Sequence, residues 1–205
     1  MRLRRLALLA SFAVVVVVAT RGGPAWAAPT GANLLLNSGA EAGASSAQGW
    51  VAVTIPGWTI ARGLPTVIRY GTPRFAAARD AERDRVGQLF AGGAGGTAEL
   101  IQTASVRRTD GRLQPTGTRY AASAWLGGDA HSEASVVVSL LSARGQVLAR
   151  RTVGPVSGKL GLRSLTGVLP SGAARARVML VLATSLTNID GPDAPLVSGD
   201  RPLTT

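Results

Sequence analysis

The sequence predicts an all-β fold, a β-sandwich or barrel, behind an N-terminal export signal. Short segments rich in β-branched or aromatic residues recur along the chain, and Gly, Pro, Ser and Asp separate them. Regular short strands of this kind are typical of sandwiches and barrels. The predicted strands are Asn33–Leu36, Val51–Ile55, Thr66–Tyr70, Val86–Phe90, Ala98–Val106, Arg119–Leu126, Ala134–Leu141, Val147–Val153, Arg163–Leu169 and Arg175–Ala183.

The N-terminus has the order of a secretory signal peptide. Basic Arg2, Arg4 and Arg5 precede the apolar stretch Leu6–Thr20, and the tripeptide Ala-Trp-Ala that ends at Ala27 offers small residues to a signal peptidase. The alternative is a membrane anchor, but the apolar stretch is shorter than the roughly 20 residues that span a bilayer. We therefore expect cleavage after residue 27.

Removal of the signal peptide, residues 1–27, leaves 178 residues for one β-sandwich domain, 28–205, which is long enough to bury a core. No later segment is long and apolar enough to span a membrane, so we expect the mature protein to be secreted. The removed segment holds four arginines and no acid, so the formal net charge falls from +11 to +7.

The basic residues are scattered arginines, with Lys159 as the single lysine. A nucleic-acid binder needs clustered charge or a recognisable module, so we expect no nucleic-acid partner. Two interpretations remain open: a solvated arginine-rich surface, or a weak, salt-sensitive attraction to anionic polymers of the cell envelope. The absence of cysteine excludes disulfides, thiolate catalysis and cysteine-ligated metals.

Local patterns predict three details of the domain. Ser142–Gln146 joins two strands as a tight hairpin whose glycine can take a positive φ. Alternation predicts that Val178, Leu180 and Leu182 share one face of the last strand. Phe75–Arg85 is the one segment with helical character, and it is either a short helix or an exposed loop.

Several motifs, taken in order, carry a family resemblance. Asn33–Gly43 is an apolar strand that runs into a small-residue turn with a lone carboxylate, and Trp50 follows it. The segment Ile55–Trp58, the strand Ala98–Gln102 and the strand Tyr120–Leu126 come after. This succession resembles carbohydrate-binding modules with the galactose-binding-like jelly-roll fold. The resemblance implies a single jelly-roll β-sandwich, a proline-tryptophan turn and a strand that carries a buried glutamine.

The resemblance also implies a structural calcium site. In similar modules a glutamate at the position of Glu41 ligates Ca²⁺ together with an aspartate of the last strand. Our candidate for this aspartate is Asp200, and Asp190 and Asp193 are the alternatives. A hard cation needs about 6–8 oxygen ligands, so one acid alone does not make a site. Pro202 is unfavourable within a central strand, so the last strand looks truncated. The alternative is that Glu41 is a solvated or turn-capping acid.

The candidate ligand contacts are two tryptophans and one late loop. Trp50 and Trp58 flank loops and are candidates for stacking on a sugar ring, whereas we expect Trp125, in mid-strand, to pack in the core. Asn188 and Asp190 belong to a Gly- and Pro-punctuated loop, and loops carry function more often than cores do. The alternatives are core packing for both tryptophans and a plain connector for the loop.

Catalysis is not expected. His131, the single histidine, lies between Asp129 and Ser132, but neighbours in sequence do not adopt the geometry of a catalytic triad. We therefore expect a secreted, non-catalytic binding module for carbohydrate at the cell envelope or outside the cell. The second class is a structural or protein-interaction sandwich without sugar recognition, and the third is a small hydrolase.

Overall fold

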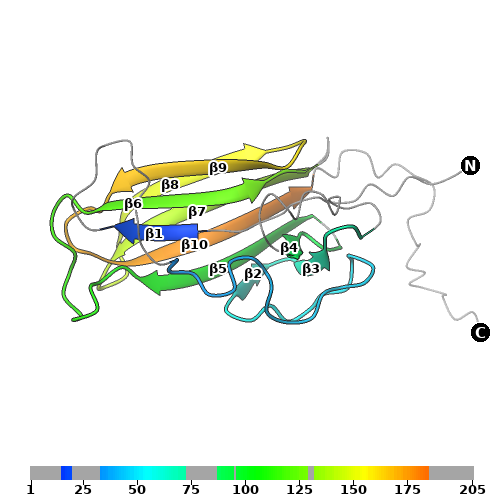
Figure 1. Ribbon diagram of the computed structural model, residues 1–205, viewed down its shortest axis with the longest axis horizontal. Coiled ribbons are helices and arrows are strands. Elements are labelled where there is room, and N and C mark those ends of the chain that lie inside the picture. The colour runs from blue at the N-terminus through cyan, green and yellow to red at the C-terminus, as the bar shows by residue number, and fades with distance from the viewer. Residues whose placement is uncertain (1–14, 20–32, 73–86, 95, 129–131, 185–205) are drawn as a thin grey trace, which may run out of the picture.

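The computed structural model describes residues 15–19, 33–72, 87–94, 96–128 and 132–184. Within these residues the chain is all-β: every paired strand is antiparallel and there is no helix (Figure 1). The predicted all-β class is confirmed at this level, whereas the jelly-roll order of strands stays a prediction. The described part contains no helix that is long and apolar enough to cross a membrane.

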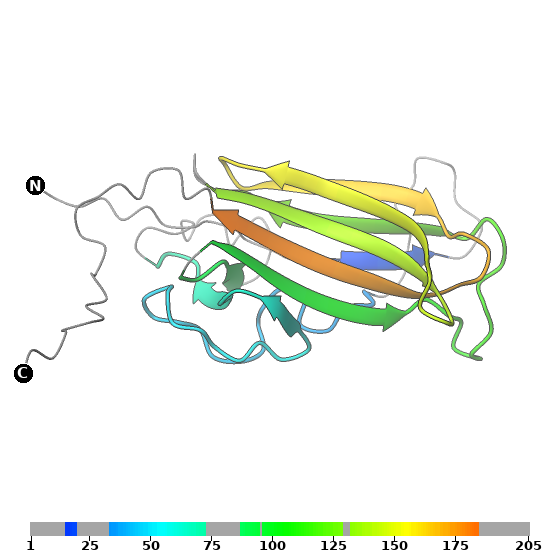
Figure 2. The same cartoon turned by 180° about the vertical axis from the view of Figure 1, so that it is seen from behind.

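The strands form two layers and a separate hairpin (Figures 1 and 2). The larger sheet contains, in spatial order, β2 (Thr59–Arg62), β5 (Thr97–Ser105), β10 (Ala173–Thr184), β7 (Ser132–Ser142) and β8 (Val147–Val156). The smaller sheet contains β1 (Val15–Ala19), β6 (Arg119–Leu126) and β9 (Gly161–Val168). The hairpin pairs β3 (Thr66–Arg69) with β4 (Gln88–Ala91).

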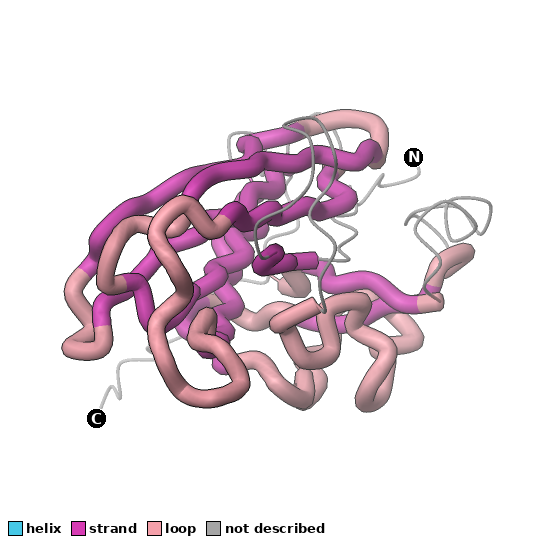
Figure 3. The backbone as a smooth tube through the Cα atoms, turned by 60° about the vertical axis from the view of Figure 1, so that its left-hand side comes forward, coloured by secondary structure: helices cyan, strands magenta, loops and turns pink. Residues whose placement is uncertain are grey.

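The core lies between the two layers. On β10, the predicted face of Val178, Leu180 and Leu182 is fully buried, because alternate residues of a strand point to the same side. The edge of the Trp58 ring packs on Phe90, with the ring centroids 5.4 Å apart. Figure 3 shows the strands together with the long loops that flank them.

Eight of the ten predicted strands are present, and the predicted hairpin joins β7 to β8. The strands predicted at Asn33–Leu36 and Val51–Ile55 are wrong, because these segments form turns and irregular chain apart from a single β-bridge residue, Asn33. The N–H and C=O of Leu36 bond to the side chain of Gln102 rather than to a neighbouring strand. One glutamine therefore replaces the strand ladder that the apolar pattern suggested.

Two strands were not predicted. β2 is only four residues long and lies between Trp58 and a Gly-Leu-Pro turn, so it lacks a readable pattern. β1 falls inside the apolar stretch that predicts the signal peptide, and it pairs with β6 from Val15↔Ser123 to Ala19↔Arg119. Cleavage after residue 27 stays a prediction.

Candidate ligand-binding site

The loop that opens the domain is organised by Asn37, which has a positive φ of 46°. Its side-chain Nδ2 donates to the carbonyls of Ala42 and Pro56, at 3.1 and 2.9 Å, and its Oδ1 accepts from the Ala42 N–H at 2.8 Å. The indole Nε1 of Trp58 donates to the Asn37 carbonyl at 3.1 Å. A short amide side chain tolerates this left-handed conformation and bonds its own neighbourhood, which fixes the turn.

Gln102 fastens this loop to the larger sheet. Its Oε1 accepts from the Leu36 N–H at 2.6 Å, and its Nε2 donates to the carbonyls of Leu36 at 3.0 Å and Gly57 at 2.7 Å. The residue is 8% exposed, so the buried glutamine that the resemblance implied is present. Gly57 has a φ of 83° in a turn closed by the Trp58 N–H on the Ile55 carbonyl, where a residue with a Cβ is disfavoured.

These contacts frame an open depression beside β5, with a volume of about 560 Å³. Leu36, of which 69% is exposed, and Ile101 supply apolar surface to its lining. Thr59, Thr103 and Ser105 supply hydroxyl groups. The Ser105 Oγ accepts from the Arg107 N–H at 3.2 Å and keeps its proton for another acceptor. The depression therefore combines apolar surface with hydroxyl groups from two neighbouring strands, β2 and β5.

The depression lies where β5 loses its outer neighbour. β2 pairs with β5 at Ile101, Leu100 and Glu99, and no described strand pairs with Thr103–Ser105 on that side. The edge of the sheet is therefore open next to the hydroxyl groups. An open edge presents unpaired backbone donors and acceptors, which add to the polar groups available to a ligand.

The tryptophans lie differently from the sequence prediction. Trp58 is only 8% exposed, so the prediction that it is exposed for sugar stacking is wrong. Its ring packs on Phe90, and its indole N–H donates a hydrogen bond to the Asn37 carbonyl. Trp50 is half-buried, and its role as a ligand contact stays a prediction. Trp125 is also half-buried, because it alternates with the buried Ala124 and Leu126 and so points away from the core that we predicted for it.

Glu41 is exposed and acts as a hydrogen-bond acceptor. Its Oε1 accepts from the backbone N–H of Gly87 at 2.6 Å and of Gln88 at 2.8 Å, which ties the opening loop to the start of β4. Among the described residues, no group of three or more His, Cys, Asp or Glu side chains could hold a metal ion. The predicted partner of Glu41, Asp200, lies outside the described residues, so the calcium site stays a prediction.

Other predicted site residues also lie outside the described part of the chain. They are Asn188, Asp190, Asp193, Asp129, His131 and the segment Phe75–Arg85. Ser132, the remaining member of the histidine loop, is 3% exposed.

Burial perturbs one titratable group in the smaller sheet. Tyr120 on β6 is 3% exposed, and burial raises its pKa above the usual 10.0, while the nearby Arg151 opposes this shift. Gly167 on β9 lies directly opposite Tyr120, and a Cβ at Gly167 would lie 2.7 Å from the tyrosine ring. The glycine leaves room for the tyrosine ring against β9, and burial favours the neutral phenol.

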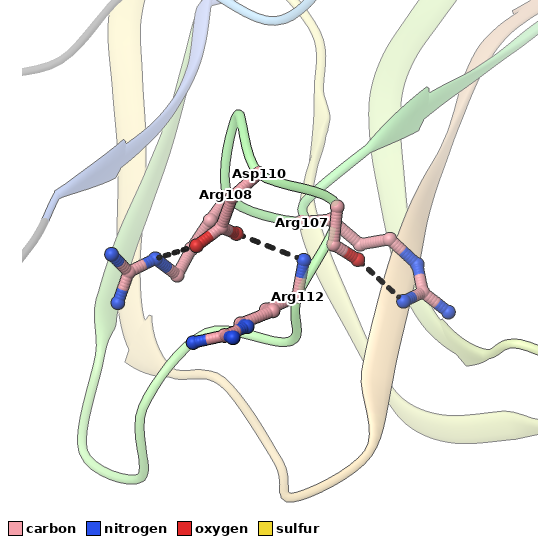
Figure 4. Close-up of polar contacts among 5 residues, drawn as sticks. Arg107, Arg108, Asp110 and Arg112 are labelled. Atoms are coloured by element: carbon pink, nitrogen blue, oxygen red, sulfur yellow. Dashed lines mark hydrogen bonds and ion pairs between the residues drawn. The ribbon is translucent and has the colours of Figure 1, made fainter.

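Several arginines lie at the end of the larger sheet where β5 ends. In the loop after β5, the Arg108 Nε lies 3.4 Å from the Asp110 carboxylate, while the Arg107 guanidinium, on the other side of the loop, donates to the Gly111 carbonyl at 2.8 Å (Figure 4). On the sheet itself, Arg177 lies opposite Thr103, and Arg175 lies opposite Ser105. Two hydroxyl residues of the depression therefore have arginines as cross-strand neighbours.

The sequence interpretation gave no role at a site to the residues that line the depression or to Asn37, which organises the loop beside it. Asn37 and Gln102 lay within the quoted motifs but were not given a role at a site. Thr103 and Ser105 alternate with Gln102 on a strand that was correctly predicted, so their shared face was readable. Their position at an open edge of the sheet could not be predicted from the sequence, because it depends on the short length of β2.

Comparison with known proteins adds little to this geometry. No protein-family model matches the chain, and no curated protein matches it. Among solved structures, the chain is similar to the enzymatically active domain of tailspike protein 4 of bacteriophage CBA120, with 17% identity and a TM-score of 0.45. The match covers 64% of this chain and 18% of that chain.

Proposed function

We propose that this protein is a secreted, non-catalytic β-sandwich module that binds carbohydrate in the depression beside β5. The observation that carries the proposal is the lining: the apolar surface of Leu36 and Ile101 lies next to the hydroxyl groups of Thr59 and Thr103. A sugar ring presents an apolar face and a rim of hydroxyls, so this lining is complementary to it. No other described residue bonds to either threonine hydroxyl, so both are available to a ligand.

The test is binding of the full chain to a glycan array, followed by affinity electrophoresis of each hit. Thr103→Val removes one hydroxyl and keeps the shape of the side chain; we expect about five- to tenfold weaker binding for each lost hydrogen bond. Thr166→Val, an exposed threonine on β9 in the other sheet, is the matched control and should bind as the unmodified protein does. Equal binding by all three proteins would place the sugar elsewhere and refute this site.

The open edge of β5 favours a second candidate, a protein-interaction module that accepts an extended peptide as an additional strand. Such a partner would bond to the free backbone edge of Thr103–Ser105 and slow hydrogen exchange of the amides that point outward there. A sugar held by side chains would leave that exchange unchanged. Hydrogen exchange with and without ligand therefore separates the two candidates.

A further inference from the structure

The outer face of the larger sheet carries a row of polar residues that begins at the depression. Thr103 on β5 lies opposite Arg177 on β10, Arg177 lies opposite Ser139 on β7, and Ser139 lies opposite Arg150 on β8. Neighbouring strands are about 4.8 Å apart, so the row alternates hydroxyl and guanidinium groups over about 14 Å. Figure 2 looks onto these four strands, and no other described strand lies in front of them.

The arginines of this face have no acidic partner among the described residues. Arg150, Arg175 and Arg177 are all exposed, and none of them forms an ion pair there. Arg175 donates to the Ala143 carbonyl at 2.9 Å, whereas no described group bonds to the guanidinium of Arg150 or Arg177. Two guanidinium groups are thus free to bind an external anion.

The acids of the same face lie too far away to neutralise this end. Glu99 lies opposite Val181, four residues along β10 from Arg177 and therefore about 13 Å away. Glu133 lies opposite Ala183, about 20 Å away. Both separations exceed the screening length of about 10 Å at 0.1 M salt, and Asp110, in the loop after β5, is paired with Arg108, so the arginine end keeps an excess of positive charge.

We propose that this face binds an acidic polysaccharide, a polymer of uronic acid, with Arg177 and Arg150 as its carboxylate contacts; the inference rests on the proposed carbohydrate function. Each uronic-acid unit carries both ring hydroxyls and a carboxylate, which matches the alternation of Ser or Thr with Arg. Arginine binds a carboxylate through two parallel hydrogen bonds. Single-stranded nucleic acid fits less well, because it is held by aromatic stacking and no described residue of this face is aromatic.

The experiment compares polygalacturonate oligomers with the same oligomers after methyl esterification, using calorimetry on the full chain. We expect the acidic form to bind at least about tenfold more tightly, since charge-assisted hydrogen bonds are roughly twice as strong as neutral ones, and to weaken steeply with salt. The double variant Arg150→Gln with Arg177→Gln should lose about tenfold or more of this binding. Arg163→Gln, the same charge change at an exposed site on β9, should lose no more than about twofold.

Arg177→Lys keeps the charge and removes the paired geometry, so an intermediate loss is expected even if the double variant folds poorly. Equal binding of the acidic and esterified oligomers would overturn the inference and leave carbohydrate binding standing. Binding of neither oligomer would also overturn the inference, whereas the proposed carbohydrate function is refuted separately, by the absence of any hit on the glycan array. Tighter binding to single-stranded DNA or polyphosphate of similar length, or equal losses in the Arg163→Gln control, would also overturn the uronate assignment.

Discussion

Replacement of Gln102 by leucine should destabilise the domain and deform the depression together. The substitution puts an apolar side chain of similar size in place of the amide and removes three hydrogen bonds, one from the Leu36 N–H and two to the carbonyls of Leu36 and Gly57. At about 1 kcal/mol for each bond, the free energy of unfolding should fall by about 3 kcal/mol. For a domain of this size, that corresponds to a fall in Tm of about 6–12 °C.

The assay is urea denaturation, followed by fluorescence and circular dichroism. Gln146→Leu is the matched control, because Gln146 is an exposed glutamine in the β7–β8 hairpin whose side chain bonds to no described residue, and it should change stability by less than about 0.5 kcal/mol. Gln102→Glu keeps the shape of the side chain but sets an acceptor against two carbonyls, so it should destabilise at least as much as leucine. A fall of less than about 1 kcal/mol in the free energy of unfolding of Gln102→Leu would refute the reasoning. It would show that water hydrogen-bonds to the loop's backbone groups in place of the glutamine.

Three further predictions follow from other groups. On the calcium hypothesis, added Ca²⁺ raises the Tm of the EDTA-treated protein, and Glu41→Gln abolishes the rise; an unchanged Tm contradicts that hypothesis. Because burial raises the pKa of Tyr120, the folded state favours the neutral phenol, so its contribution is complete below pH 10.0 and is lost as the pH rises through the higher folded-state pKa. Melting curves from pH 9 to 12 or so should therefore fall more steeply for the unmodified protein than for Tyr120→Phe, and parallel curves would disprove the assignment. Gly167→Ala brings a Cβ against the Tyr120 ring and should cost about 1–3 kcal/mol of stability in urea denaturation, whereas no loss would show that the ring moves aside.

The sequence predicted the strands that have a clear period and failed where side chains replace backbone pairing. The alternation of Val178, Leu180 and Leu182 placed β10 correctly, because a half-buried strand requires that pattern. Asn33–Leu36 has the composition of a strand, but its backbone groups bond to Gln102, a residue 66 positions away, and no local pattern encodes that contact. Trp58 was misplaced for a similar reason, since its burial depends on Phe90 from a distant hairpin.

The depression was beyond sequence reasoning because it is formed by the end of one strand rather than by a motif. The pairing of β2 with β5 does not extend past Ile101. The hydroxyl groups of Thr103 and Ser105 lie beyond this last paired residue, so they are available to a ligand. The row that contains Arg177 and Arg150 was also beyond sequence reasoning. Arg150 and Arg177 are scattered in the sequence, and the antiparallel registers of β10, β7 and β8 bring them onto one face.

The pairing of β1 with β6 involves residues that are also predicted to be removed with the signal peptide. Val15–Ala19 forms part of the predicted signal peptide, yet in the folded protein the same five residues form the edge strand of the smaller sheet. If residues 1–27 are removed as predicted, the mature domain loses β1, and the edge of β6 that β1 covers is left without this partner.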